Sequence, residues 1–227
     1  MTTQGKYEVD ILPTSAGDLH ITFLGHGSLI FTFNGKHFYV DPFSKVANYK
    51  KLPKADVALI THEHFDHLDP EALASIRTGQ TVVVLTEICA RQVQGGIVMH
   101  NGDRRTVCGV PVEAVPAYNI VHKREDGQPF HPQGAGNGYI LTFGDKRVYV
   151  AGDTENIPEM KVIPDIACAF LPMNLPYTMT PEMVADSAKV FQPRILYPYH
   201  FGNTDTSKLN DLLRQESGIE VRVRKLA

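Results

Sequence analysis

Residues Thr61–Asp69 read THEHFDHLD, a stretch that gathers three histidines and three acidic residues in one short segment. The apolar run KADVALIT leads straight into it, which is typical of a buried strand. Asp69 and Pro70 then supply an N-cap and a first helical residue for a helix that continues to about Arg77. We therefore predict that the histidines lie on a strand-to-helix loop at the edge of a sheet, where binding sites are commonly built.

The side chains of this loop are metal donors. Imidazole nitrogen and carboxylate oxygen suit zinc and neighbouring first-row metals, and a catalytic ion usually takes three protein ligands and leaves a position open. His62, His64, Asp66 and His67 provide four donors within six residues, which is more than one such ion needs. This predicts two adjacent metal ions, with His62 and His64 at one and Asp66 and His67 at the other.

Alternating apolar runs recur along the rest of the chain and predict a strand-rich fold with helices between some strands. Further helices are expected from Thr180-Pro181 through PEMVADSAKVF and from Thr206 to Glu216. Two hairpins, SLIFTF-NG-KHFYV (28–40) and GYILTF-GD-KRVYV (138–150), match without a gap. Either two-residue turns impose this pattern, or the chain contains an internal duplication whose halves pack sheet to sheet.

Length and composition limit the alternatives. A chain of 227 residues with 43% hydrophobic and 21% charged residues suits one soluble domain over residues 1–227. No stretch approaches the roughly 20 apolar residues of a membrane span, and the N-terminus resembles no signal or transit peptide, which predicts a cytoplasmic protein. A net charge of -3 gives no reason to expect a nucleic-acid partner. Homo-oligomers are compatible with the sequence.

The pattern HxHxDH after a strand resembles the metallo-β-lactamase superfamily. That family places a metal-bridging aspartate after a later strand and a last histidine after another, and here VYVAGDT supplies Asp153 and ILYPYH supplies His200. FLGHGSLI and the VDPF around Asp41 are most similar to the branch of L-ascorbate-6-phosphate lactonase-like and N-acyl-phosphatidylethanolamine phospholipase-like hydrolases. The resemblance implies an α/β (α+β) fold, a four-layer αββα sandwich of two similar halves.

The resemblance also implies roles around the metals. Asp41 is expected to hold a ligand histidine from below, because an imidazole ligand needs its second nitrogen fixed; a simple strand-end turn is the alternative. His26, in LGHGS, is expected near the cleft as a supporting or substrate-contacting residue, or else as a structural histidine.

The sequence identifies the third histidine ligand of the first metal less directly than the other ligands. Many relatives carry it at the end of the strand before the GY hairpin, where this chain has Asn119. His122 and His131 are the candidates nearby. We favour His131, because it lies in a turn that leads directly into the next strand, whereas His122 lies in a charged stretch. If neither binds, Asn119 is left as a weak carbonyl contact.

Together these features predict a hydrolase that uses a metal-activated water at a site of two divalent ions. Asp153 would bridge the ions, and Asp66 would ligate and take up the proton. Zinc is the first choice of metal, with Mn, Fe and Ni as alternatives. The expected substrate is a small molecule, namely a lactone, ester or phosphate ester. The alternatives are a phosphodiesterase acting on a lipid or nucleotide, and a non-catalytic metal-dependent binding or sensing module.

Overall fold

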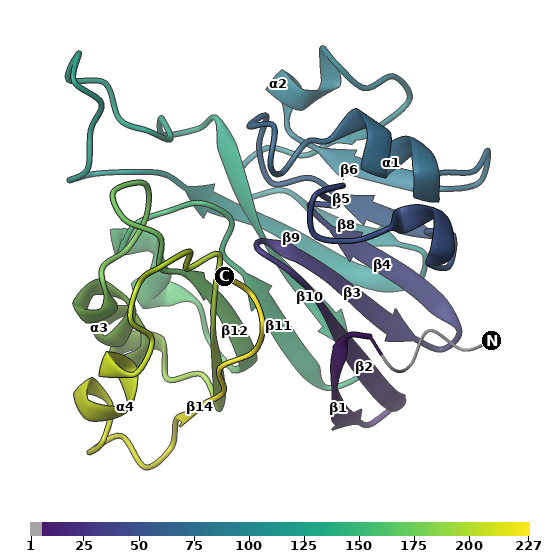
Figure 1. Cartoon of the computed structure of the whole chain (residues 1–227). Helices are drawn as coiled ribbons and strands as arrows, with labels where there is room; N and C mark the ends of the chain where they lie inside the picture. Colours follow the sequence, from purple (N-terminus) through teal and green to yellow (C-terminus); the bar gives the residue numbers. More distant parts are fainter. Residues whose placement is uncertain (1–5) are drawn as a thin grey trace.

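Two seven-stranded sheets lie face to face in the computed structural model, which describes residues 6–227. Helices cover the outer face of each sheet, so the order of layers is helix, sheet, sheet, helix (Figure 1). The prediction of a four-layer αββα sandwich is confirmed. The assignment of residues 1–227 to one domain stays a prediction, and its first five residues lie outside the described part.

The first sheet contains the first seven strands in chain order. Its first four strands pair antiparallel, and its last three are added in parallel. The strands are β1 (Glu8–Thr14), β2 (Gly17–Gly25), β3 (Ser28–Phe33), β4 (Lys36–Val40), β5 (Val57–Leu59), β6 (Val82–Leu85) and β7 (Ile97–Val98).

The second sheet repeats this plan, with four antiparallel strands followed by three parallel ones. Its strands are β8 (Arg104–Val107), β9 (Val110–Ala117), β10 (Gly136–Phe143), β11 (Lys146–Val150), β12 (Ile166–Pro172), β13 (Ile195–Tyr199) and β14 (Glu220–Val221). The two hairpins noted in the sequence are β3–β4 and β10–β11, and they pair in the same register: Phe33 faces Lys36 in one, and Phe143 faces Lys146 in the other. The two halves are therefore similar in structure as well as in sequence.

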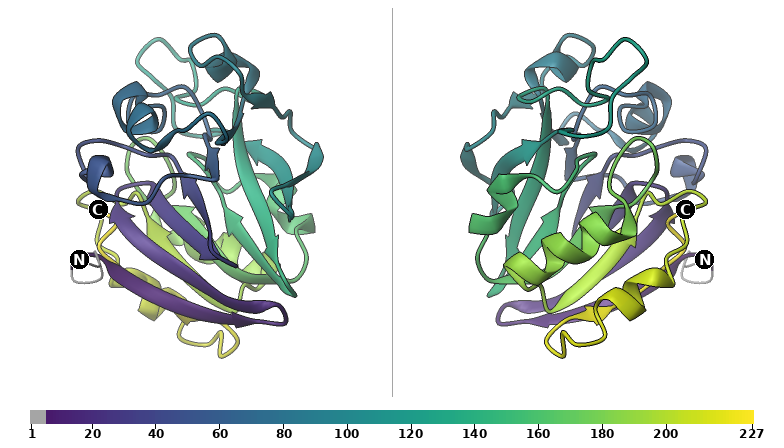
Figure 2. Two further views of the ribbon diagram at one scale, coloured as in Figure 1. Left: turned by 90° about the vertical axis from the view of Figure 1, so that its right-hand side faces the viewer. Right: turned by 90° about the vertical axis from the view of Figure 1, so that its left-hand side faces the viewer.

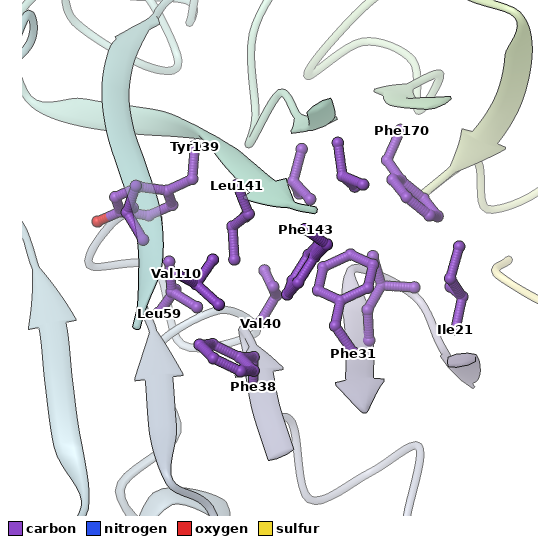
Figure 3. Packing of buried hydrophobic residues seen from close by; sticks show 14 of the residues in the cluster. Ile21, Phe31, Phe38, Val40, Leu59, Val110, Tyr139, Leu141, Phe143 and Phe170 are labelled. Atoms are coloured by element: carbon purple, nitrogen blue, oxygen red, sulfur yellow. The ribbon is translucent and has the colours of Figure 1, made fainter. Parts of the chain in front are cut away.

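Apolar side chains from both sheets form one core between them (Figure 3). Phe143 of β10 packs against Phe31, Phe33 and Phe38 of the first sheet, with ring centroids 5.2 to 5.8 Å apart. Such offset and edge-on aromatic pairs stabilise a core beyond the burial of their area. This packing fixes the position of one sheet relative to the other, and with it the spacing of residues at the strand ends.

The helices pack on the outer faces of the sheets (Figure 2). α1 (Pro70–Ile76), α2 (Glu87–Ala90) and the short η1 (Tyr49–Lys51) cover the first sheet, and α3 (Pro181–Phe191), α4 (Lys208–Leu212) and η2 (Pro158–Val162) cover the second. No helix in residues 6–227 is long and apolar enough to cross a membrane.

All three predicted helices are present, and the third is shorter than expected. Asp69 accepts hydrogen bonds from the amides of Glu71 and Ala72 at the start of α1, and Thr180 caps α3 in the same way. The helix predicted from Thr206 to Glu216 is reduced to α4. The side chain of Asp205 accepts from the Ser207 amide and hydroxyl, which favours a turn where the helix was expected to begin.

Candidate metal centre

The two sheets meet at the carboxyl ends of their central parallel strands. There the backbone N–H of Asn137 donates to the backbone carbonyl of Thr61 at 2.9 Å. Gly152 adopts a left-handed conformation (φ +67°), and a Cβ on it would lie 2.8 Å from the Asn137 carbonyl oxygen. Only glycine fits this close approach of three chain segments. The contact brings the loop after β5 next to the residues that follow β11.

The structure brings every predicted metal-ligating residue to this junction. The first half contributes the loop between β5 and α1, and the second half contributes residues from three separate segments. His62, His64 and His131 form one group of donor atoms, and His26, Asp66, His67 and His200 form another; in each group the donor atoms lie within 4.8 Å of one another. A third group, His62, His67 and Asp153, overlaps the first two. His62 and His64 thus share one group and Asp66 and His67 another, and their assignment to two metal ions stays a prediction.

His131 occupies the place of the third histidine, and His122 does not. The ring of His131 lies 5.0 Å from His62 and 4.9 Å from His64, measured between ring centroids. The Nδ1 atom of His122 instead lies 2.6 Å from a carboxylate oxygen of Glu155. His131 therefore lies with His62 and His64 as the sequence predicted, and its role as a metal ligand stays a prediction.

Asp153 lies between the two groups. Its Oδ1 is 3.5 Å from Nε2 of His67, and its Oδ2 is 3.3 Å from Nε2 of His131 and 3.7 Å from Nε2 of His200. Asp66 faces the second group, with Oδ2 at 3.5 Å from Nε2 of His200. Because the carboxylate of Asp153 is close to residues of both groups, its position suits a ligand that bridges two metal ions.

These separations fit atoms that share a metal ion better than atoms that share a proton. Two donors bound at 2.0–2.2 Å to one tetrahedral ion lie about 3.4 Å apart, whereas N–H···O hydrogen bonds measure about 2.9 Å. Six buried atoms of the donor residues have no hydrogen-bond partner among residues 6–227: Nε2 of His62, His67, His131 and His200, Nδ1 of His200, and Oδ1 of Asp153. Buried polar atoms are rarely left in this state, so the donor set fits metal ions.

His26 differs from the other members of its group. Its Nε2 lies 2.9 Å from Oδ2 of Asp66, which is a hydrogen-bond distance. Its ring packs on His200 with centroids 3.7 Å apart. His26 thus holds two donor residues in place, which matches the supporting role expected for it.

Asp41 and Thr61 hold His62 and His67 through hydrogen bonds to their Nδ1 atoms. Nδ1 of His67 donates to Oδ2 of Asp41 at 2.8 Å. The hydroxyl of Thr61 donates to the same oxygen at 2.6 Å and accepts from Nδ1 of His62 at 3.0 Å. Both histidines therefore carry their proton on Nδ1 and direct Nε2 towards the other donors. The sequence predicted this role for Asp41, but it carried no signal for Thr61.

Asn119 supports His131 and is not itself part of a donor group. Its Oδ1 accepts from the amide of His131 at 2.9 Å and from Nδ1 of His131 at 2.6 Å, which leaves Nε2 facing Asp153. Its Nδ2 donates to Glu155 at 3.2 Å and to the Tyr177 carbonyl at 2.9 Å. The position needs both an acceptor and a donor, which an amide supplies. The carbonyl contact to a metal, considered from the sequence, is therefore not required.

Glu155 is a site residue that the sequence did not reveal. It is 1% exposed, and its carboxylate accepts from the backbone amides of Ile120, Val121 and His122 at 2.6 to 2.7 Å. Burial opposes ionisation, but these amide hydrogen bonds lower the pKa of Glu155 below its usual value. The carboxylate thus anchors the start of the loop between β9 and β10 that carries His131.

The electrostatics favour bound cations. Burial lowers the pKa of His62 well below 6.5, with a further contribution from His67, and burial and His131 lower the pKa of His64. Burial alone would raise the pKa of Asp153, yet the charges of His200 and His67 hold it well below its usual range. Burial opposes a charge on His67 too, but Asp153 and Asp41 raise the pKa of His67 well above 6.5. A metal ion would take the place of the proton on His67, because neutral imidazoles and ionised carboxylates are the forms in which these groups bind metals.

Three site residues hold unusual backbone conformations. His26, Asp41 and His200 are non-glycine residues with φ between +41° and +54°. Each of these residues directly follows the last residue of a strand, β2, β4 or β13. A backbone conformation of this kind costs about 1–3 kcal/mol relative to an ordinary one. Such outliers cluster at functional sites, where packing over-determines them.

A cavity of about 420 Å³ opens over the donor groups. It is lined by His64, Phe65, Asp66, Arg124, Phe130, His131, Asp153, Asn174, Tyr177 and His200. Its volume suits a small molecule. The cavity gives such a molecule access to residues of both donor groups.

Comparison with known proteins agrees with this geometry. The family described as the β-lactamase superfamily domain matches residues 20–200, and the chain belongs to the metallo-β-lactamase superfamily. Within it, the chain is 34% identical over 200 residues to a UPF0173 metal-dependent hydrolase of Koribacter versatilis, an alignment that covers 81% of this chain and 84% of that protein. The chain is accordingly a metal-dependent hydrolase of this superfamily.

Solved structures show the same fold. A Parabacteroides distasonis protein assigned as a metal-dependent hydrolase superposes with a TM-score of 0.93 at 48% identity, covering 97% of this chain and all of that one. The metallo hydrolase Igni18 of Ignicoccus hospitalis superposes with a TM-score of 0.75 at 24% identity, covering 92% of this chain and 96% of that one, and shares the fold. The superfamily predicted from the sequence is confirmed, whereas the narrower branch within it stays a prediction.

Proposed function

We propose that this hydrolase cleaves a small lactone, ester or phosphate ester at a centre of two divalent metal ions, with zinc as the first choice. One observation carries the proposal. Two groups of buried donor atoms lie side by side, share contacts with Asp153, and open into a cavity of small-molecule size. A single ion would leave part of this donor set without a partner.

His62, His64 and His131 would hold one ion, and Asp66, His67 and His200 would hold the other, with Asp153 between them. When bound, such ions lower the pKa of a water molecule towards neutrality and polarise a carbonyl or phosphoryl oxygen. The chain itself supplies the orientation of the donors. Asp41 fixes His67 directly and His62 through Thr61.

Asp66 is the proposed proton acceptor. Its side chain is 20% exposed and lines the cavity, so a proton released there can reach it. His26 donates to Oδ2 of Asp66 and fixes the direction of the carboxylate. Burial favours the neutral acid, but the nearby imidazoles of His200 and His26, the latter through its hydrogen bond, hold the pKa of Asp66 below its usual range and keep it ready to accept.

The alternatives named from the sequence differ in their support. A phosphodiesterase acting on a lipid or nucleotide would use the same donors, and substrate tests must separate it from the leading proposal. The idea of a non-catalytic module rested on Asn119 in place of a ligand histidine. Because Asn119 orients His131, which completes the first donor group, that support is removed. A cytoplasmic location and the absence of a nucleic-acid partner stay predictions.

Elemental analysis of protein purified without chelator tests the metal centre. We expect about two equivalents of Zn, Mn, Fe or Ni, or their recovery on reconstitution. The reconstituted protein is then assayed on lactones, phosphodiesters, phosphomonoesters and amides. Trace metal alone, with no reconstitution, would refute the centre, and a fully loaded protein that cleaves none of these classes would refute the hydrolytic proposal.

A further inference from the structure

A positively charged side chain lies at the cavity over the donor groups. Arg124 lines this cavity. Its Nη2 donates to the carbonyl of Phe130 at 3.2 Å, and its guanidinium lies 5.3 Å from the centroid of the Phe130 ring. Among the residues that the structure describes, no carboxylate lies within 4.0 Å of it. The remaining capacity of the guanidinium to donate hydrogen bonds is therefore directed to whatever enters the cavity or to water.

Local structure holds this side chain in place. Arg124 lies near the tip of the loop between β9 and β10, which Figure 1 shows in teal projecting beyond the ends of both strands. The loop is a small hairpin of its own: Lys123 pairs with Pro129, and the Arg124 amide donates to the Gln128 carbonyl at 2.7 Å. Phe130 in turn packs edge-on against Tyr177, with centroids 5.1 Å apart. Arg124 is exposed to solvent, and stacking on a ring that is itself packed favours a position of its guanidinium at the cavity.

Apart from Arg124 and the histidines and aspartates of the donor groups, the cavity lining is mainly aromatic. Phe65 is 69% exposed and Tyr177 is 45% exposed, so both present aromatic surface to an incoming molecule. Asn174 adds an uncharged amide. The two carboxylates that line the cavity, Asp66 and Asp153, belong to the donor groups below. A molecule that contacts all these side chains would place its scissile bond at the metal centre, an apolar body against the aromatic rings, and a negative charge next to Arg124.

We propose that the substrate carries an anionic group, a carboxylate or a phosphate, remote from the bond that is cleaved, and that Arg124 binds this group. The inference rests on the proposed hydrolytic function and adds the chemical class of the substrate. An arginine presents paired N–H donors that match both oxyanions in a two-point contact. The neighbouring Lys123 does not line the cavity, and Lys45, which stacks on Phe43 and Phe65, lines a separate one.

Matched esters test the charge requirement in the zinc-loaded protein. The three esters are para-acetoxybenzoate, para-acetoxybenzylphosphonate and the methyl ester of para-acetoxybenzoate, which share the scissile acetate and differ in charge at the far end. We expect at least one anionic ester to exceed the neutral one in kcat/KM by about 10-fold or more, the effect of a charge-assisted hydrogen bond. The better anion identifies the group that Arg124 prefers.

Three variants assign the effect to the residue. Arg124→Gln is expected to lower kcat/KM for the preferred anion to that of the neutral ester, and Arg124→Lys to keep part of the preference because it keeps the charge without the fork. Lys123→Gln, a neighbouring charge on the same loop, is the matched control and should behave as the wild type. Equal kcat/KM for charged and neutral esters, or a preference that survives in Arg124→Gln, overturns the inference while hydrolysis stands.

A binding measurement separates this inference from the proposed function. Calorimetry with para-acetamidobenzoate, para-acetamidobenzylphosphonate and the neutral methyl ester of para-acetamidobenzoate needs no turnover. If no ester is cleaved but an anionic amide binds about 10-fold more weakly to Arg124→Gln than to the wild type, the hydrolytic proposal fails and the anion site stands. If no ester is cleaved and the amides bind both proteins equally, both proposals fail.

Discussion

Replacing Glu155 with glutamine tests how the third histidine is held. One carboxylate oxygen accepts from the amides of Ile120 and Val121, and the other accepts from the amide of His122 and from Nδ2 of Asn119. Glutamine must place an NH₂ group at one of these positions, so two donors lose their acceptor in either orientation. At about 1–3 kcal/mol for each buried unsatisfied group, the substitution costs about 2–6 kcal/mol.

The loop is the part of the molecule that can relieve this cost. If residues 119–131 move outward, Oδ1 of Asn119 leaves Nδ1 of His131, and the first donor group loses its fixed histidine. Loss of such an orienting contact weakens metal binding by about 10- to 100-fold. Chelator competition measures the affinity, and elemental analysis measures the metal content. A cost of 2 kcal/mol or more should also lower Tm by about 4 °C or more.

Glu125→Gln is the matched control, because Glu125 lies on the same loop and is exposed. It should leave metal affinity and Tm at the wild-type values. The reasoning would be refuted by a folded Glu155→Gln protein that binds zinc with wild-type affinity. That result would mean that His131 is held by its turn alone or does not bind metal.

Three further predictions concern single side chains. His131→Ala should lose about one equivalent of metal while His122→Ala keeps both, and a loss confined to His122→Ala would reverse the assignment. Asp66→Asn should reduce kcat by ~10²-fold or more, as expected for a general base, and unchanged turnover would remove Asp66 from that role. Tyr139→Phe removes a 2.9 Å hydrogen bond to the buried carbonyl of Ile60, which should cost about 1–3 kcal/mol and lower Tm by at least about 2 °C; an unchanged Tm would show that water replaces the hydroxyl.

The features that the sequence predicted are those written in short, local strings. Alternation of apolar residues marks the strands, and polar residues directly after them mark the strand ends that meet at the site. Asp153 and His200 could be named because each follows such a run and matches the resemblance. The paired register of the two hairpins was also visible, since a two-residue turn fixes which residues face each other.

The features that the sequence did not reveal depend on contacts between distant segments. Thr61 and Glu155 are ordinary polar residues until the fold places them against His62 and against the loop that begins at Asn119. The same holds for Asp10, which pairs with Arg224 across more than two hundred residues and joins β1 to the end of the chain. No local pattern marks such residues, because their partners are set by packing and not by spacing.

The two halves contribute to the metal centre in different ways, although their folds are alike. The first half supplies its donors from one loop, which Asp41, Thr61 and the capped helix α1 fix from three sides. The second half supplies one donor each from three segments, and the segment with His131 is held through Asn119, Glu155, Tyr177 and its own turn. The same loop also carries Arg124, which lines the cavity over the donor groups. Glu155 therefore supports the loop that carries both His131 and Arg124. A change in this one buried carboxylate should alter metal affinity and anion preference together.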